Sequence, residues 1–382
     1  MKKNLLYTGL LLMGIMGLAS CSDDDDNGTD IGSKDPANIE YTSEVAASWH
    51  NYANNVAALL KSDATELYNA WTTSYNGGEA YATTFKNHSG GDYTSAINCV
   101  SQIIDGCATI ANEVGTAKIG EPYDFWMSGN TTQALYAVES WYSWHSRDDY
   151  TNNIWSIRNA YYGTLDGTIA DHSISTFVKS HDEALNTKVI AAINDAADAI
   201  QAIPQPFRSN INSSETVVAM DACDALDKVF ANDLTSFINN HDDEEAYSKI
   251  ATNYVDVVVL PTYKNLMDKN TALYNSVVAL SKNPSNLAFA KACEAWLEAR
   301  EPWEQSEAFL FGPVDALGLD PNMDSWPLDQ AAIVNILKSG NFNDINWGDG
   351  DSDEAIEAAQ NVRGFHTLEF LLFKDGQPRK AE

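Results

Sequence analysis

The sequence predicts an all-α protein made of two packed helical bundles. Strand-like alternation of apolar and polar residues is scarce along the 382 residues, whereas long alanine-rich segments with apolar residues every three or four positions are frequent. Prolines gather between these segments, at positions 204, 206, 284, 313, 321 and 327, where they are expected to end helices. These observations favour helical bundles over any sheet-containing class.

The helical periodicity divides the chain into successive predicted helices. They cover residues 42–76, 94–115, 130–161, 172–203, 214–239, 245–268, 271–281, 286–311, 328–338 and 352–374. The β-branched run from Val255 to Val259 lies inside a longer helical pattern, so it is assigned to a helix. The charged stretch HDDEE ends at residue 245, and the boundary between the bundles is predicted there, giving 40–245 and 246–382.

The first residues, MKKNLLYTGLLLMGIMGLASC, are typical of a secretory signal that ends in a lipid-attachment site. Two lysines precede an apolar stretch too short to span a bilayer comfortably, and small residues stand directly before Cys21. Residues 1–20 are therefore predicted to be a signal peptide, and Cys21 is predicted to carry the lipid. We expect an outer-membrane lipoprotein, on the cell surface or the periplasmic face, held to the membrane by this anchor.

An acidic, polar stretch follows the anchor over residues 21–39, beginning with Asp23 to Asp26. One interpretation is a solvated tether. The other is a sorting signal, because acidic residues just after a lipidated cysteine resemble the signal that sends lipoproteins of Bacteroidetes-type bacteria to the cell surface. The two interpretations are compatible.

The charge of the chain argues for cationic ligands. Its formal net charge of −31 would repel nucleic acid and anionic membrane surfaces, so neither is an expected partner. Cys99 and Cys107 are eight residues apart on one predicted helix, too far to form a disulfide with each other. No CxxC pair occurs, which leaves a zinc ribbon or a thioredoxin-type redox site unsupported.

The stretch RGFHTLEFLLF, residues 363–373, holds the strongest candidate site. Its large apolar residues cover every side of a helical wheel, so the helix is predicted to be buried nearly all round. His366 and Glu369 are three residues apart and share one helix face. A buried imidazole and carboxylate require a cation, a partner charge or a hydrogen-bond network. Gly364 indicates a close approach of another segment.

Two further segments place polar residues among aromatic ones. In AWLEAREPWEQSEAFLFGP, residues 295–313, helical spacing puts Arg300 and Glu307 on one face with two tryptophans, and Glu304 is near enough to join them. A buried structural ion pair and a ligand site both explain this pattern. In residues 137–163, Glu139, Asp149 and several serines interleave with aromatic residues, which suits either a polar pocket wall or hydrogen bonds between helices.

The spacings exclude several metal sites. Neither H-E-x-x-H nor H-x-x-E-H is present, because Phe370 stands where the inverted motif needs histidine. A site of histidine and carboxylates suits iron, zinc or copper rather than calcium, whose ligands are all oxygen. The spacing does not choose among these metals.

These stretches resemble the imelysin family of bacterial helical proteins. The family signature G-x-H-x-x-E matches as Gly364, His366 and Glu369, and the resemblance extends over AREPWEQSEAFLFGP and DALGLDPNMDSWPLDQ. The segments IANEVGTAKIGEPY, VESWYS and NIWSIRNAYYG resemble the part that normally follows the signature helix, yet here they precede it. The chain therefore resembles a circular permutant, which implies that Tyr41 and Lys374 lie near each other.

Carried over to this sequence, the resemblance implies a site between the two bundles. Its implied metal ligands are His366, Glu369, Glu307 and Glu304. Its other implied ligand-binding residues are Arg300, Ser306, Glu139, Ser140 and Asp149.

We expect a cell-envelope lipoprotein that binds iron, as an ion or within haem, during iron uptake, together with envelope uptake partners. The resemblance implies iron, whereas the residues alone indicate a cation or a polar ligand. One alternative is a metal-dependent peptidase that uses Glu304 as base together with Glu369. Binding is favoured because neither complete protease motif occurs. Another alternative is a buried polar cluster that only holds the bundles of an interaction module together.

Overall fold

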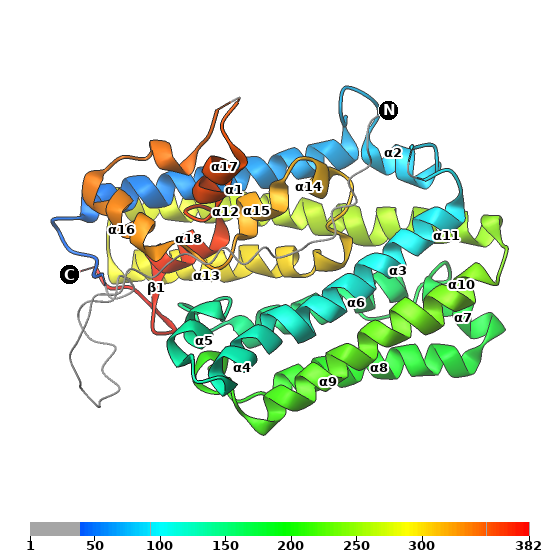
Figure 1. The fold of residues 1–382 in the computed structure, drawn as a ribbon. Helices are drawn as coiled ribbons and strands as arrows, with labels where there is room; N and C mark the ends of the chain where they lie inside the picture. The colour runs from blue at the N-terminus through cyan, green and yellow to red at the C-terminus, as the bar shows by residue number, and fades with distance from the viewer. Residues whose placement is uncertain (1–38, 92, 349, 382) are drawn as a thin grey trace.

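The structure, a computed structural model, describes residues 39–91, 93–348 and 350–381. These residues form an all-α fold, which confirms the predicted class (Figure 1). The predicted signal peptide, Cys21 and residues 21–38 of the predicted tether lie outside the described residues. Within the described part of the chain, no helix has both the length and the apolar character needed to cross a bilayer.

The α-helices are α1 (Ala46–Thr72), α2 (Tyr81–Lys86), α3 (Ala96–Glu113), α4 (Gly120–Met127), α5 (Thr131–Ala137), α6 (Ser146–Tyr162), α7 (Ile174–His181), α8 (Glu183–Ala202), α9 (Ser214–Lys228), α10 (Thr235–Asn239), α11 (Glu244–Asn253), α12 (Leu260–Lys282), α13 (Asn286–Glu304), α14 (Pro313–Ala316), α15 (Leu319–Asp324), α16 (Gln330–Ser339), α17 (Asp353–Gln360) and α18 (Gly364–Leu372). The π-helical turns are η2 (Val114–Lys118), η4 (Val229–Leu234) and η5 (Tyr254–Val259), and the 3₁₀ turns are η3 (Phe207–Ser209), η6 (Glu307–Phe309) and η7 (Asn343–Ile345). Strands β1 (Phe373–Lys374) and β2 (Gln377–Pro378) pair antiparallel, with Phe373 opposite Pro378.

Local sequence signals start many of these helices. A serine or aspartate at the N-cap accepts a bond from a backbone N–H in the first turn, which satisfies one of the free donors there. The caps of this kind are Ser173, Asp182, Ser213, Asp243, Ser285, Asp329 and Ser352. Two helices, α6 and α16, end at left-handed glycines, Gly163 and Gly340.

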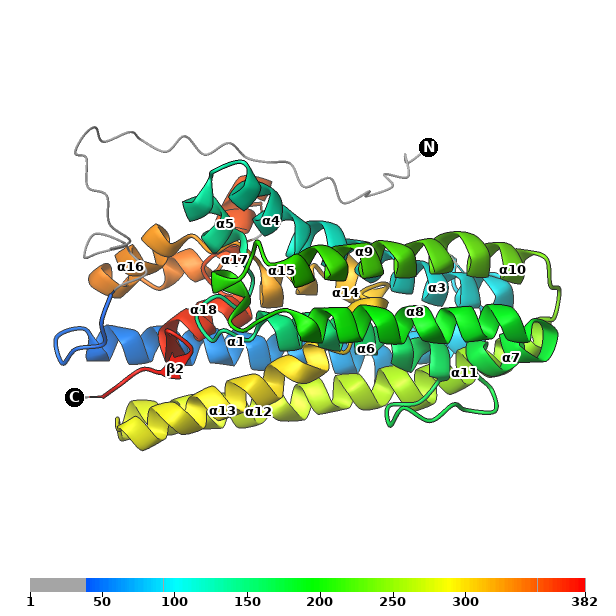
Figure 2. The same cartoon turned by 90° about the horizontal axis from the view of Figure 1, so that it is seen from below.

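One group of helices contains α1, α12, α13 and α18. Helix α1 packs along α12 and against α18, and α12 packs along α13 (Figures 1 and 2). Two hydrogen bonds tie α1 to the end of the chain: Trp49 Nε1 donates to the Leu371 carbonyl at 2.9 Å, and the Tyr52 hydroxyl donates to the Val362 carbonyl at 2.6 Å. The predicted boundary at residue 245 is therefore wrong for α1, because its apolar face is buried by helices from the second predicted bundle.

The other group contains α3, α6, α8 and α9. Helix α8 packs against α9 and α6, and α3 packs against α9 and α6 (Figure 2). Helix α11 also packs on α3, and it continues without a break through η5 into α12. One long helical segment thus spans both groups, so the cut predicted at 245 falls at its start. Contacts between α13 and α6 join the groups next to the site described below.

Several predicted helices have different bounds. The predicted helix 130–161 is interrupted at 138–145, and 352–374 divides into α17 and α18. The predicted helix 286–311 ends at Glu304, after Pro302 in its last turn, whereas 245–268 and 271–281 are one continuous segment. Residues 312–327, which lie between two predicted helices, are partly helical, as α14 and α15. Apolar periodicity continued across these breaks, which depend on contacts distant in sequence.

The two ends of the described chain lie together. Lys374 forms an ion pair with Glu40, and Arg379 Nη1 donates to the Ile39 carbonyl at 2.8 Å. The expected proximity of the Tyr41 and Lys374 regions is therefore confirmed. Circular permutation requires this proximity and itself stays a prediction.

Candidate metal centre

Helix α18 carries the signature residues into the interior. All nine of its residues are buried, as its apolar pattern predicted. Its first residue, Gly364, has φ +85°, and a Cβ there would lie 2.5 Å from the carbonyl oxygen of Met323. Only glycine meets both demands without strain. The predicted close approach is thus to the backbone of α15, which brings Asp324 beside the signature helix.

His366 is surrounded by carboxylates. Its exposed fraction is 0%. Nε2 lies 3.1 Å from Asp324 Oδ1 and 3.4 Å from Glu139 Oε1, while Nδ1 lies 3.0 Å from Glu369 Oε2. The Trp326 ring packs against the imidazole in an edge-to-face arrangement, with ring centroids 4.8 Å apart. Both ring nitrogens therefore face acidic partners, and Nε2 faces two of them.

Glu369 is held by the segment 138–145 between α5 and α6. Its Oε1 accepts from the backbone N–H groups of Ser143 at 2.7 Å and Tyr142 at 3.1 Å. Ser140 and Trp144 take φ of +52° and +62°, a left-handed conformation that non-glycine residues seldom adopt and that concentrates at functional sites. Since both oxygens of Glu369 are engaged, the geometry favours Glu369 as the group that orients His366 rather than as a ligand beside it.

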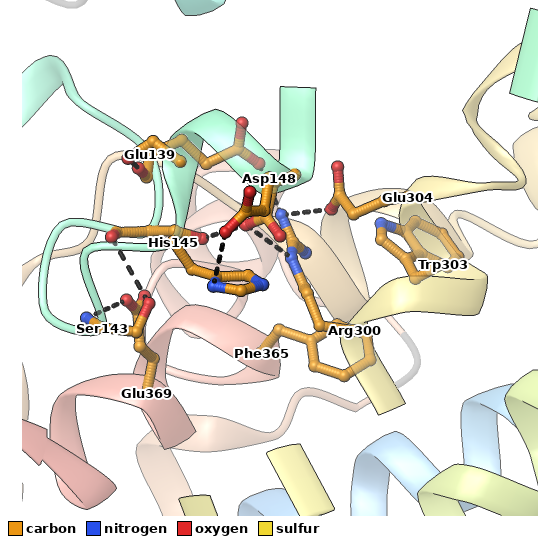
Figure 3. Close-up of polar contacts among 12 residues, drawn as sticks. Glu139, Ser143, His145, Asp148, Arg300, Trp303, Glu304, Phe365 and Glu369 are labelled. Atoms are coloured by element: carbon orange, nitrogen blue, oxygen red, sulfur yellow. Dashed lines mark hydrogen bonds and ion pairs between the residues drawn. The ribbon is translucent and has the colours of Figure 1, made fainter. Parts of the chain in front are cut away.

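Arg300 sits at the centre of the cluster. Its Nη2 lies 2.6 Å from both Glu139 Oε1 and Glu304 Oε1, and Nη1 pairs with Asp324. Its Nε is 3.6 Å from Asp149 Oδ2. Figure 3 shows Arg300 and Glu304 reaching the cluster from α13, with Glu369 entering from α18 next to Ser143. One guanidinium thus neutralises carboxylates from both helical groups.

Further side chains complete this network. Ser140 donates to Asp149, Asn153 Nδ2 donates to Glu304 Oε2 at 2.6 Å, and Trp303 Nε1 donates to Asp324 Oδ2 at 2.6 Å. Lys118 Nζ lies 3.1 Å from Glu139 Oε2. Lys118 is the last residue of the π-helical turn η2, and π turns frequently occur at functional sites.

Burial and charge divide the carboxyl groups into two sets. Against the effect of burial, Lys118, His366 and Arg300 hold the pKa of Glu139 well below its usual range. Arg300 and His366 likewise lower the pKa of Asp324 against its burial. By contrast, burial raises the pKa of Glu304 to about 8 despite Arg300. Burial also raises the pKa of Glu307 well above its usual range, opposed by Lys118.

The charge of His366 follows from its neighbours. Burial and Arg300 act to lower its pKa, but hydrogen bonds to Asp324, Glu139 and Glu369 outweigh them and raise it well above the usual value. In the metal-free protein the imidazole is therefore protonated at neutral pH. A metal at Nε2 would have to displace the proton on that nitrogen. Nδ1 would keep its proton and donate it in the hydrogen bond to Glu369.

In the part of the chain that the structure describes, two groups of three side chains place their ligand atoms within 4.8 Å of one another. One group is Glu139, Asp324 and His366, and the other is Glu304, Glu307 and Asp324. The four predicted metal ligands are thus divided. His366 belongs to the first group, Glu304 and Glu307 belong to the second, and Glu369 belongs to neither. Asp324 belongs to both.

The remaining implied residues have different surroundings. Glu139, Asp149 and Arg300 are in the network, and Ser140 joins it through Asp149. Ser306 is buried, but its hydroxyl donates to the Trp303 carbonyl at 2.7 Å, so its observed role is to close the end of α13.

Asp324 and Lys118 were missed as site residues. Both lie in stretches that carry the family resemblance, DALGLDPNMDSWPLDQ and IANEVGTAKIGEPY. Each is a charged residue with apolar or aromatic residues close by in sequence, and this pattern could have indicated a buried charge. Their partners, Arg300 and Glu139, are on other elements, so spacing along the chain did not reveal them.

We expect the metal-free protein to lose stability as the pH rises from about 4 to about 8, the interval between the unfolded and folded pKa values of Glu304. Glu304 holds its proton in the folded state up to about pH 8, while the unfolded chain releases it above about 4.3. This contribution is full below the unfolded pKa and is lost as pH rises through the folded pKa, at about 1.4 kcal/mol per pH unit. The raised pKa of His366 acts in the same direction.

Urea unfolding with a chelator, repeated across this pH range, measures the slope. Glu304→Gln is expected to make it shallower, and Glu301→Gln, an exposed position on the same helix, is the control. Equal slopes in the two variants would show that Glu304 does not carry the effect.

Comparison with known proteins connects this cluster to a family. The imelysin model (peptidase family M75) matches residues 24–232 and 259–382. The crystal structure of an imelysin peptidase from Bacteroides ovatus is 64% identical and superposes with a TM-score of 0.90, covering 91% of this chain and 100% of that one.

Two iron-regulated proteins are similar over shorter stretches. The chain is 33% identical over 130 residues to iron-regulated protein A of Synechococcus elongatus, which is 34% of this chain and about a third (32%) of that relative's length. A putative iron-regulated protein A precursor from Parabacteroides distasonis is 34% identical, with a TM-score of 0.42 over 45% of this chain and 51% of that one. Since the family model covers most of the sequence, the chain belongs to the imelysin family.

Proposed function

We propose that this protein binds a metal cation, with iron as the physiological one, at Glu139, Asp324 and His366 during iron uptake in the cell envelope. The observation that carries this proposal is the convergence of an imidazole nitrogen and two carboxylate oxygens within 4.8 Å in a buried site. Nitrogen together with oxygen donors suits first-row metals. The iron-regulated protein of Synechococcus elongatus supports iron among them.

The charge balance of the cluster supports a cationic ligand. Five acidic groups contact the basic groups of the network: Glu139, Asp149, Glu304, Asp324 and Glu369. Three basic groups face them: Arg300, Lys118 and His366. With every group ionised the cluster would carry two surplus negative charges. A bound cation would remove this surplus and release the protons that the cluster otherwise retains.

The geometry favours an ion over haem. Haem ligation needs an apolar slot beside the histidine. His366 Nε2 instead faces Asp324, Glu139 and Arg300 Nη2, which lies 3.3 Å away. Charged groups thus occupy the position that the iron of a haem would need.

A peptidase is the second candidate, favoured by the description of the Bacteroides ovatus relative. Catalysis at a metal requires an open coordination position and access for the peptide. Here Glu304 and His366 are 0% exposed, and Arg300 occupies the middle of the carboxylates. Moreover, burial raises the pKa of Glu304 to about 8, so in the metal-free cluster it is not a base at neutral pH. We therefore rank binding first.

The lipoprotein assignment is part of the proposal. Its support is the N-terminal pattern that ends in Cys21 and the acidic stretch after it. Attachment to the outer membrane through this lipid would keep the metal site in the envelope, where uptake partners operate.

Calorimetric titration of the purified, lipid-free mature chain tests the site. Ferrous, ferric, zinc and copper ions and haem are each titrated into the parent, His366→Ala, Glu369→Gln and His172→Ala. We expect His366→Ala to lose at least about 100-fold in affinity for the preferred ion, and Glu369→Gln to lose about 10–100-fold, as metal-orienting partners do. His172 is exposed and far along the chain, so its variant should match the parent.

Unchanged affinity in His366→Ala for every ligand would overturn the proposal and leave a structural role for the cluster. Incubation with an unfolded polypeptide and zinc separates the second candidate. Chelator-sensitive cleavage that disappears in Glu304→Gln but persists in Glu301→Gln would favour peptidase activity over metal binding as the function.

A further inference from the structure

Glu307 is a buried carboxylate without a partner. It lies in the turn η6 just after α13 and is 8% exposed. Over residues 39–91, 93–348 and 350–381, its carboxylate has no hydrogen-bond or ion-pair partner, in contrast to Glu139, Glu304 and Glu369. Buried polar groups almost always have partners, because leaving one unpaired costs free energy. The oxygens of Glu307 are thus available to a ligand inside the cluster.

The neighbours of Glu307 provide further oxygen atoms. Its ligand oxygen lies within 4.8 Å of those of Glu304 and Asp324. Oxygen ligands lie about 2.0–2.6 Å from a bound magnesium or calcium ion, so two ligands of one ion are at most about 5 Å apart. A second unsatisfied acceptor is adjacent, because Asn153 Oδ1 is buried without a partner while its Nδ2 donates to Glu304.

We propose that Glu304, Glu307 and Asp324 form a second cation site that accepts hard cations through oxygen ligands alone. Such a set suits calcium, magnesium, manganese or a trivalent ion, whereas the site at His366 includes a nitrogen donor. The inference rests on the proposed function, since it adds a second position to the same cluster and shares Asp324 with the first.

In the absence of an ion at the second site, Arg300 balances the charges of two of its three carboxylates. Its guanidinium contacts Glu304 and Asp324, two members of the second site, but no contact joins it to Glu307 within the described residues. An ion at the second site would compete with the guanidinium for Glu304 Oε1. The charge of Lys118 lowers the pKa of Glu307 against its burial, but within the described residues no hydrogen bond or ion pair joins the two side chains.

Terbium is a suitable probe because it is a hard trivalent ion whose emission is sensitised by nearby indoles. Trp303 Nε1 lies 2.6 Å from Asp324 Oδ2, so an indole is next to the proposed ion. Terbium is titrated into the purified mature chain with excitation of tryptophan. We expect sensitised emission in the parent and a loss of at least about 10-fold in apparent affinity in Glu307→Gln. Trp303→Phe should lose the emission but keep calorimetric binding.

Glu301→Gln is the matched control, because Glu301 is an exposed glutamate in the last turn of α13, directly before η6. The acidic surface will also attract terbium, and this control measures that background. Glu307→Gln removes a carboxylate that has no partner, so it should fold with an unchanged or higher melting temperature. If it does not fold, Glu307→Asp withdraws the oxygens by one methylene and should still weaken terbium binding.

The inference is overturned if Glu307→Gln binds terbium with the same affinity as the control Glu301→Gln. Where Glu307→Asp replaces Glu307→Gln, the same comparison applies to it. Failure of the inference is distinguishable from failure of the proposed function through His366→Ala, which should keep terbium binding while losing the nitrogen-requiring metal. Terbium binding that depends on Glu307, with iron and zinc binding unaffected by His366→Ala, would support the second site and refute the first.

Discussion

Replacement of Arg300 by methionine is expected to lower the free energy of unfolding by about 3–5 kcal/mol, the range for breaking a buried ion pair. The guanidinium is 0% exposed and lies 2.6 Å from oxygens of both Glu139 and Glu304. Methionine keeps much of the apolar stem but leaves these carboxylates, and Asp324, without their shared partner. Urea unfolding with a chelator present measures the loss.

Arg158→Met is the control for Arg300→Met. Arg158 is half-buried, donates to Asn159 on its own helix and lies over the Trp155 ring at 4.3 Å, so its replacement should cost below about 1 kcal/mol. Equal losses in the two variants would contradict a central role for Arg300. A cation that fits the cluster should stabilise Arg300→Met more than the parent, since it would substitute for the lost charge.

Gly364→Ala is expected to cost roughly 2–5 kcal/mol, by adding overpacking to an unfavourable backbone conformation. The new Cβ would lie 2.5 Å from the Met323 oxygen and 2.8 Å from the Met323 carbonyl carbon. Backbone atoms cannot rotate away, so α15 must move and carry Asp324 with it. We therefore expect the variant to lose metal affinity as well as stability, in calorimetry and urea unfolding respectively.

Gly340→Ala separates the two causes. Gly340 has φ +68°, and a Cβ at this position would have no other atom within 4 Å, so the variant tests the backbone conformation alone, at about 1 kcal/mol. If Gly364→Ala costs no more than Gly340→Ala, the close approach of α15 does not constrain the signature helix.

The signature helix was predictable because its information is local. Apolar residues on every face of 363–373 indicated burial, and the three-residue spacing placed His366 and Glu369 together, as the 3.0 Å contact between them shows. Arg300 and Glu304 were likewise related by one helical turn, and they form an ion pair. Helical periodicity alone carried these predictions.

The segment that holds Glu369 was not predictable in the same way. The periodicity of 130–161 predicted one helix. Residues 138–145 instead leave the helical conformation, and the backbone N–H of Ser143 donates to the carboxylate of Glu369, 226 residues later in the chain. Asp324 depends similarly on Arg300 and His366, which lie on other elements. Contacts between distant segments determined both, and no local propensity encodes them.

The pairing of α1 with the end of the chain also governs how the molecule is made. Trp49 bonds to Leu371, 322 residues later, and α12, which covers much of α1, is complete only at Lys282. At about 5–20 residues per second, a ribosome takes on the order of tens of seconds to produce that length. The apolar face of α1 therefore emerges long before its partners exist. Since α18 is among those partners, the native contacts of the first helix can form only when nearly the whole chain is available.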